Sequence, residues 1–136
     1  MDIHYYADRK LNNPYFWVAV SGQHGALFGA NMLLDGFRPD FIQGEGVISC
    51  VFKELSLLPQ LYTVSMAVRA EDGSRALFKP TDVGFFQIIG TASEIGFQSD
   101  IADTLAWVSS PVVVPYEWHL PNNSTYSMVP VKISAN

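Results

Sequence analysis

The chain has 136 residues, of which 49% are hydrophobic and 15% charged, and its formal net charge is −5. This length suits one domain that buries a sizeable core without disulfides. The negative charge and the thinly spread 8 Lys and Arg residues argue against nucleic acid and anionic lipid as partners, because phosphate binding depends on clustered cations.

Short strands separated by turns follow from the first residues onward. The strands expected from period-2 alternation are residues 3–6, 15–21, 26–31, 47–53, 62–69 and 84–90. A hairpin loop is expected at residues 22–25, and a longer surface excursion around Asp35, Gly36 and Pro39. Because no long segment with a 3.6-residue period appears, the pattern predicts an all-β, antiparallel sandwich. The one exception is residues 99–107, where a short helix is expected.

The stretch from Leu55 to Gly73 carries the clearest signal. Pro59 closes the preceding segment, because it fixes φ and cannot continue a ladder. A strand then starts at Tyr62, with every second side chain inward and Ser65 and Arg69 on the opposite face. A Tyr at the start of a strand after a bend is typical of the tyrosine corner of Greek-key sandwiches. We therefore interpret Tyr62 as structural and not as a ligand contact.

The other strands allow similar expectations. In residues 15–21, Phe16 and Val18 face the core and Trp17 faces outward. In residues 47–53, the inward set is expected to be Ile48, Cys50 and Phe52. We therefore interpret Cys50 as a buried core thiol, which is compatible with a reducing compartment.

Two regions are harder to assign from the pattern. Residues 75–82 contain Pro80 and are expected to form an irregular edge or loop. Residues 126–133, after a polar loop, could form an edge strand on this molecule or on a neighbour.

The sequence offers few candidates for catalysis or metal binding. His4, His24 and His119 are far apart in the sequence, and no phosphate-binding loop occurs. The acidic loop with Asp35, Asp40 and Glu45 could bind a hard cation, but it lacks calcium-loop spacing, so a solvated loop is favoured. We expect no cofactor and no enzyme activity.

Surface aromatics are the strongest binding signal. Trp17 and Phe85 are assigned outward, beside polar Ser65, Arg69 and Gln87. Flat rings stack on the apolar C–H faces of sugars, and amide, hydroxyl and guanidinium groups bond sugar hydroxyls. The pattern thus predicts a carbohydrate site at these five residues. The alternative is that another subunit or the tail covers the rings.

Three segments carry a family resemblance. They are LLPQLY at residues 57–62, FQI at 86–88 and PVVVPYEW at 111–118. In this order and spacing they resemble the C-terminal domain of the ATP-binding subunit of O-antigen polysaccharide ABC exporters, the Wzt carboxy-terminal domain. The likeness covers roughly Ile3 to Trp118. Gln60 stands where that family usually has Gly, and the family normally has a strand before the one at Ile3.

The resemblance implies an immunoglobulin-like fold and a non-catalytic function. Such a domain binds the modified non-reducing end of the lipid-linked O-antigen polysaccharide and selects it for ATP-driven export. The implied partners are the ATPase domain and the membrane subunit, at the cytoplasmic face of the bacterial inner membrane. Family members form homodimers by exchanging a terminal strand, which suggests a sandwich at 1–120 and an exchangeable tail at 121–136.

Two other functions compete with glycan binding. The chain could be a structural dimerisation module that docks on the ATPase domain and binds no glycan. A hydrolase using Asp35 and Glu45 is disfavoured, because no outward carboxylate pair falls on adjacent strands.

Overall fold

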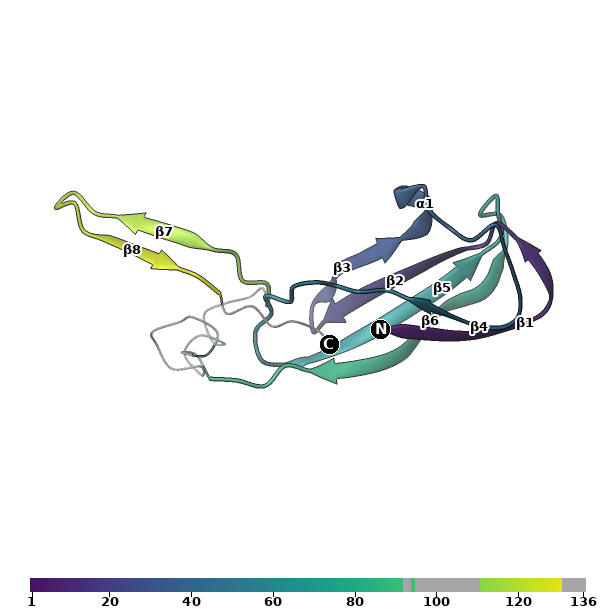
Figure 1. The fold of residues 1–136 in the computed structure, drawn as a ribbon. Coiled ribbons are helices and arrows are strands. Elements are labelled where there is room, and N and C mark those ends of the chain that lie inside the picture. Colours follow the sequence, from purple (N-terminus) through teal and green to yellow (C-terminus); the bar gives the residue numbers. More distant parts are fainter. Residues whose placement is uncertain (92–93, 95–110, 131–136) are drawn as a thin grey trace. The chain divides into compact units, whose positions relative to one another are not determined.

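A computed structural model describes residues 1–91, 94 and 111–130 of the chain (Figure 1). It is an all-β, antiparallel protein, as the sequence predicts, and the described residues include one short helix. The chain divides into two compact units. The first comprises Met1–Val51 and Tyr62–Phe86, and the second comprises Phe52–Leu61 and Gln87–Asn136. No described helix is both long and apolar enough to cross a membrane.

The first unit is a sandwich of two sheets. Strand β1 (Asp2–Asn12) pairs antiparallel with β4 (Phe41–Ser49). The larger sheet has the order β3-β2-β5-β6. Its strands are β2 (Tyr15–Gly22), β3 (Gly25–Asn31), β5 (Leu61–Arg69) and β6 (Ala76–Gln87). Side chains from both sheets meet in one core, which contains Ile3, Ala7, Phe16, Val18, Ile42, Val64 and Val68.

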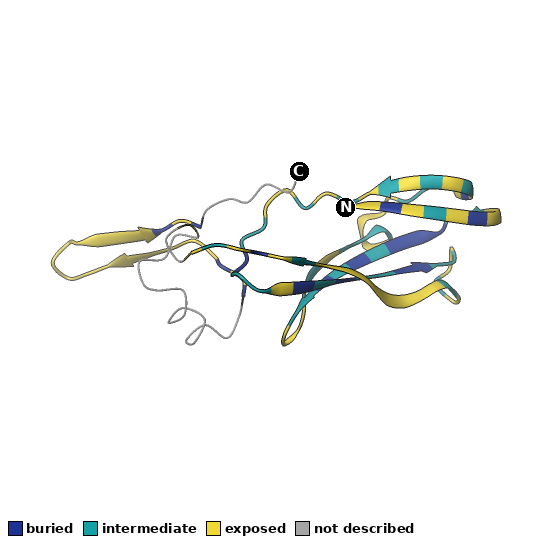
Figure 2. Ribbon diagram, turned by 90° about the horizontal axis from the view of Figure 1, so that it is seen from below, coloured by how far each residue is buried: buried dark blue, intermediate teal, exposed yellow. Residues whose placement is uncertain are grey.

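Alternation along the strands produces this core. Figure 2 shows buried and exposed residues alternating along β1, where Ile3 is buried and its neighbours are exposed. In β2, Phe16 and Val18 are buried, as predicted. Tyr62 at the start of β5 is fully buried, and its ring stacks on Phe86 with centroids 5.3 Å apart. Its expected inward packing is therefore confirmed.

The prediction for β4 was wrong. The strand begins at Phe41, not Val47, and Gly44 and Gly46 lie inside it. A Cβ at Gly46 would meet the ring of Tyr5, its partner in the β1–β4 register. The ring occupies the space that a side chain would need, which is how a strand accommodates a glycine.

Of the inward set expected in this region, Ile48 packs against the core, but the other two residues do not belong to it. Cys50 and Phe52 follow β4 and are only partly buried, whereas Ile42 near the start of the strand is buried. The core position therefore moves towards the beginning of the strand, because the strand itself starts earlier.

Two further elements were expected only in outline. The surface excursion contains a helix, α1 (Met32–Asp35), which Asn31 caps and Gly36 ends at φ 64°. Strand β6 continues through Pro80, so of the two expectations for residues 75–82, an irregular edge or a loop, the structure shows an edge strand. Proline has no backbone N–H to donate. It is tolerated there because β6 is an edge strand, and one side of an edge strand has no neighbouring strand to bond. The helix expected at residues 99–107 lies outside the described residues.

The second unit contains a short core and a hairpin. Leu57 and Val112 form an isolated bridge, and Leu58, Val113 and Met128 pack together. Strand β7 (Tyr116–His119) pairs with β8 (Thr125–Met128) of the same chain. The boundary expected after residue 120 falls in the turn between them. Exchange of the tail with a second copy stays a prediction.

Candidate functional site

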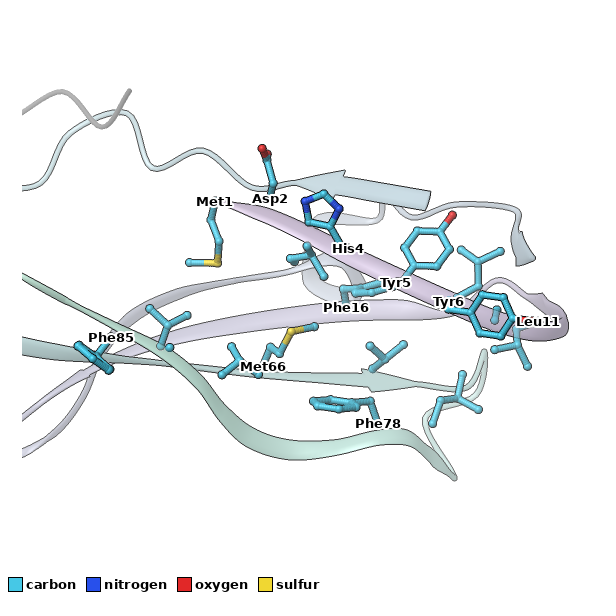
Figure 3. A pocket seen from close by; sticks show the side chains of 18 of the residues that line it. Met1, Asp2, His4, Tyr5, Tyr6, Leu11, Phe16, Met66, Phe78 and Phe85 are labelled. Atoms are coloured by element: carbon cyan, nitrogen blue, oxygen red, sulfur yellow. The ribbon is translucent and has the colours of Figure 1, made fainter. Parts of the chain in front are cut away.

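An apolar groove separates the two sheets of the first unit (Figure 3). Its volume is about 730 Å³. Side chains from both sheets line it, among them Tyr5, Phe16, Ile42, Met66, Phe78 and Phe85. Below, this is called the inter-sheet groove. It continues the hydrophobic core, because Phe16 and Ile42 belong to both.

A smaller hollow lies on the other face of the larger sheet. Its volume is about 350 Å³. The residues that line it are Trp17, Val18, Gly29, Ala30, Asn31, Leu34 and Asp35. Below, this is called the Trp17 hollow. Trp17 alternates with Phe16 along β2, so the hollow and the groove lie on opposite faces of one sheet.

The pairing of β2 with β3 and β5 determines which residues lie beside Trp17 in the hollow. Trp17 lies opposite Asn31 of β3 and Ala67 of β5, and directly paired residues share a face. Ala67 is 0% exposed although it is on the outward face. We attribute this burial to the indole beside it. Gly29 also lines the hollow, and a Cβ there would overlap the Val18 carbonyl oxygen.

Helix α1 supplies the polar side of the hollow. The Oδ1 of Asn31 accepts a hydrogen bond of 2.9 Å from the Leu33 N–H, which caps the helix. That bond fixes the amide and leaves its two N–H donors available. Among the described residues, neither the Asp35 carboxylate nor the Trp17 indole N–H has a partner. Trp17, Asn31 and Asp35, which carry an aromatic ring, amide donors and a carboxylate acceptor, thus line one small cavity.

Three of the five predicted site residues share the face of the Trp17 hollow. They are Trp17, Ser65 and Arg69, on adjacent strands β2 and β5. The polar groups of two are already engaged in structure. The Ser65 hydroxyl donates to Asp82 at 2.6 Å, and the Arg69 guanidinium donates to the Gly73 carbonyl at 3.0 Å.

The other two residues are placed elsewhere. Phe85 is 76% exposed and lines the inter-sheet groove. Gln87 is the exposed last residue of β6 and belongs to the second unit. The structure therefore does not bring Phe85 to Trp17.

A break in the alternation of β6 explains the position of Phe85. Asp82 bonds Ser65 on the outward face, whereas Phe86 stacks on inward Tyr62. Residues four apart in a regular strand share a face. The alternation of β6 is therefore broken between Asp82 and Phe86, and Phe85 and Phe86 both line the groove.

Sequence reasoning did not include Asn31 or Asp35 among the carbohydrate-site residues. A weak signal was present: Asn31 before an apolar segment and Gly36 after Asp35 are start and stop signals of a short helix. Their proximity to Trp17 follows from the β2–β3 pairing, which the sequence alone did not specify.

In the described part of the chain, no three His, Cys, Asp or Glu residues gather as a metal site.

The sequence matches no protein-family model and no curated protein. The geometry of the Trp17 hollow and the resemblance to the exporter domain therefore carry the functional argument.

Proposed function

We propose that the chain is a non-catalytic glycan-binding module. It binds O-antigen polysaccharide at the modified non-reducing end and so selects the polymer for ATP-driven export by an ABC transporter. The observation that carries the proposal is the partly exposed Trp17, which lines one hollow together with Asn31 and Asp35. The glycan class comes from the family resemblance.

The chemistry of the hollow suits a sugar ring. A pyranose presents an apolar C–H face that stacks on an indole, while its hydroxyls donate to a carboxylate and accept from an amide. The volume of about 350 Å³ lies in the range of small-molecule sites, and a few placed polar groups among apolar walls give orientation.

In this proposal the module acts beside the ATPase domain and the membrane subunit, at the cytoplasmic face of the inner membrane. A shallow sugar site binds weakly, on the order of micromolar to millimolar. A homodimer would present two such sites to one polymer and raise the effective affinity without new contacts.

The inter-sheet groove favours a second candidate function. Phe85 and Tyr6 are 76% and 74% exposed there, and contiguous exposed apolar surface commonly marks a protein contact. The alternative is therefore a structural dimerisation module that docks on the ATPase domain and binds no glycan.

Calorimetric titration separates the two functions. The wild-type chain is titrated with the O-polysaccharide of its source strain and with the same polymer lacking its terminal modification. We expect heat only with the modified polymer. We expect Trp17→Ala to weaken binding at least ~30-fold, as removal of a central aromatic contact does.

Phe85→Ala is the matched control, because it removes an aromatic ring from the opposite face of the sheet. We expect it to bind the polymer like the wild type. Absence of heat with both polymers, or loss of dimer in Phe85→Ala with Trp17→Ala unchanged, would support the dimerisation module instead.

A further inference from the structure

The residues that line the Trp17 hollow carry negative charge and no positive charge. Of its lining residues only Asp35 is charged, and no Lys, Arg or His is among them. Nearby cations are engaged elsewhere. Arg69 donates to the Gly73 carbonyl, and Arg38 donates to the carbonyls of Asn13 and Glu71. The chain as a whole carries −5.

We propose that the Trp17 hollow selects an uncharged sugar residue, which it binds through neighbouring hydroxyl groups, and discriminates against phosphorylated or carboxylated sugars. The inference rests on the proposed function and names the class of sugar that this site accepts. It would exclude an anionic substituent from the sugar seated on Trp17, not from the rest of the polymer.

Donor and acceptor geometry supports recognition of hydroxyls. The Asp35 carboxylate has two oxygens that only accept, and hydrogen bonds to a charged acceptor are among the stronger ones. The Asn31 amide only donates towards the hollow, because its Oδ1 is held by the Leu33 N–H. One hydroxyl can donate to Asp35 while its neighbour accepts from Asn31. A bound hydroxyl pair therefore satisfies both side chains.

An anionic substituent on a sugar in the hollow would be disfavoured by the Asp35 carboxylate. Its oxygens cannot donate to Asp35, and the two negative charges would repel each other with no cation in the hollow to compensate. Because Asp35 is exposed, salt would screen part of this repulsion. The affinity for an anionic sugar should therefore rise with ionic strength, whereas the affinity for a neutral sugar should not.

Saturation-transfer NMR and calorimetry on the full chain test this inference. The probes are neutral methyl hexosides, paired with the corresponding uronic acids and hexose 6-phosphates at equal ionic strength. We expect the anionic member of each pair to bind at least ~10-fold more weakly in wild type. Asp35→Asn keeps the shape of the side chain. It should weaken neutral binding several-fold and reduce the discrimination to within ~3-fold.

Glu45→Gln is the matched control, because it removes the same charge from β4, outside the hollow; it should leave both affinities unchanged. Equal or tighter binding of the anionic sugars, or unchanged discrimination in Asp35→Asn, would overturn the inference. Binding of the polysaccharide without binding of any neutral hexoside would also overturn it, while the proposed function stands. Failure of the polysaccharide itself to bind would overturn the proposed function.

Discussion

The two faces of the β3-β2-β5-β6 sheet differ in what they expose. The inner face carries the core and opens into the apolar inter-sheet groove, whose exposed rings include Phe78 and Phe85. The outer face carries Trp17 and Ala67 between two polar residues, and both polar side chains are bonded within the chain: Ser65 to Asp82, and Arg69 to Gly73. Between them lies the Trp17 hollow, where polar groups remain uncommitted.

Because the two faces differ in this way, we expect the inner face to determine the stability of the fold and the Trp17 hollow to determine ligand recognition. Burial of apolar surface stabilises a fold without regard to direction, so substitutions on the inner face should act mainly on unfolding. Directed hydrogen bonds give specificity, so substitutions in the hollow should act mainly on binding. Substitutions on the two faces test that separation.

The inner face should show the largest loss of stability. Tyr62 is 0% exposed and stacks on Phe86. Tyr62→Ala should therefore lower the free energy of unfolding by about 3–5 kcal/mol, as expected for truncation of a buried aromatic side chain. Denaturant unfolding measures this, with Tyr62→Phe as a milder comparison. A loss below about 1 kcal/mol for Tyr62→Ala would show that the inner face is not the stabilising one.

A substitution at Gly29 should reduce both the stability of the fold and the binding of glycan. A Cβ there would overlap the Val18 carbonyl oxygen, so Gly29→Ala must displace β3 from β2. We expect a loss of about 1–3 kcal/mol from this overpacking, together with loss of glycan binding, because Trp17 and Asn31 are paired across these strands.

The matched control for Gly29→Ala is Gly84→Ala. A Cβ at Gly84 meets no atom within 4 Å, so this variant should unfold within about 0.5 kcal/mol of wild type. Equal stability of the two variants would contradict the close approach of β2 and β3.

Ser65 should contribute a little to stability and nothing to binding. Its hydroxyl donates to Asp82 across β5 and β6. Loss of one partly exposed hydrogen bond in Ser65→Ala should cost about 0.5–1.5 kcal/mol, and the calorimetric affinity for glycan should stay unchanged. A Ser65→Ala variant that folds normally but binds weakly would extend the site along the outer face.

The β5–β6 turn should show the smallest effect and belongs to neither face. The hydroxyl and the N–H of Ser74 hold the pKa of Asp72 below its ordinary value. A lowered pKa stabilises the folded state above the ordinary value, and this contribution disappears as the pH falls through the folded-state pKa. The stability difference between wild type and Asp72→Ala should therefore be small at neutral pH and shrink in acid. A difference that grows in acid would contradict it.

Alternation predicted much of the fold, because the two faces of β2 and β5 differ in polarity. Phe16 and Tyr62 could be placed inside, and Trp17 outside, from parity alone. Parity failed where the backbone is irregular. In β6 the alternation is broken between Asp82 and Phe86, so that Phe85 lines the groove together with Phe86. In β4 the ring of Tyr5 fills the space beside Gly46. Neither effect is visible from a local pattern.

The candidate site was predictable only in part. Trp17 could be identified because an outward Trp beside polar positions is unusual. Asn31 and Asp35 could not be joined to it, because their approach depends on the pairing of β2 with β3 and on a four-residue helix. Ser65 and Arg69 were placed on the correct face, but the sequence did not reveal that Asp82 and Gly73 already hold their polar groups.

The most direct test of the central claim is a chemical-shift map of the ¹⁵N-labelled chain during titration with fragments of the O-polysaccharide. The chain has 3 Trp residues, and Trp17→Phe assigns the indole N–H signal of Trp17. We predict that this signal and the amides of Asn31 and Asp35 shift together and saturate at one concentration, while Phe78 and Phe85 do not respond. Shifts confined to the inter-sheet groove, or no shift at Trp17 at saturating glycan, would contradict the account.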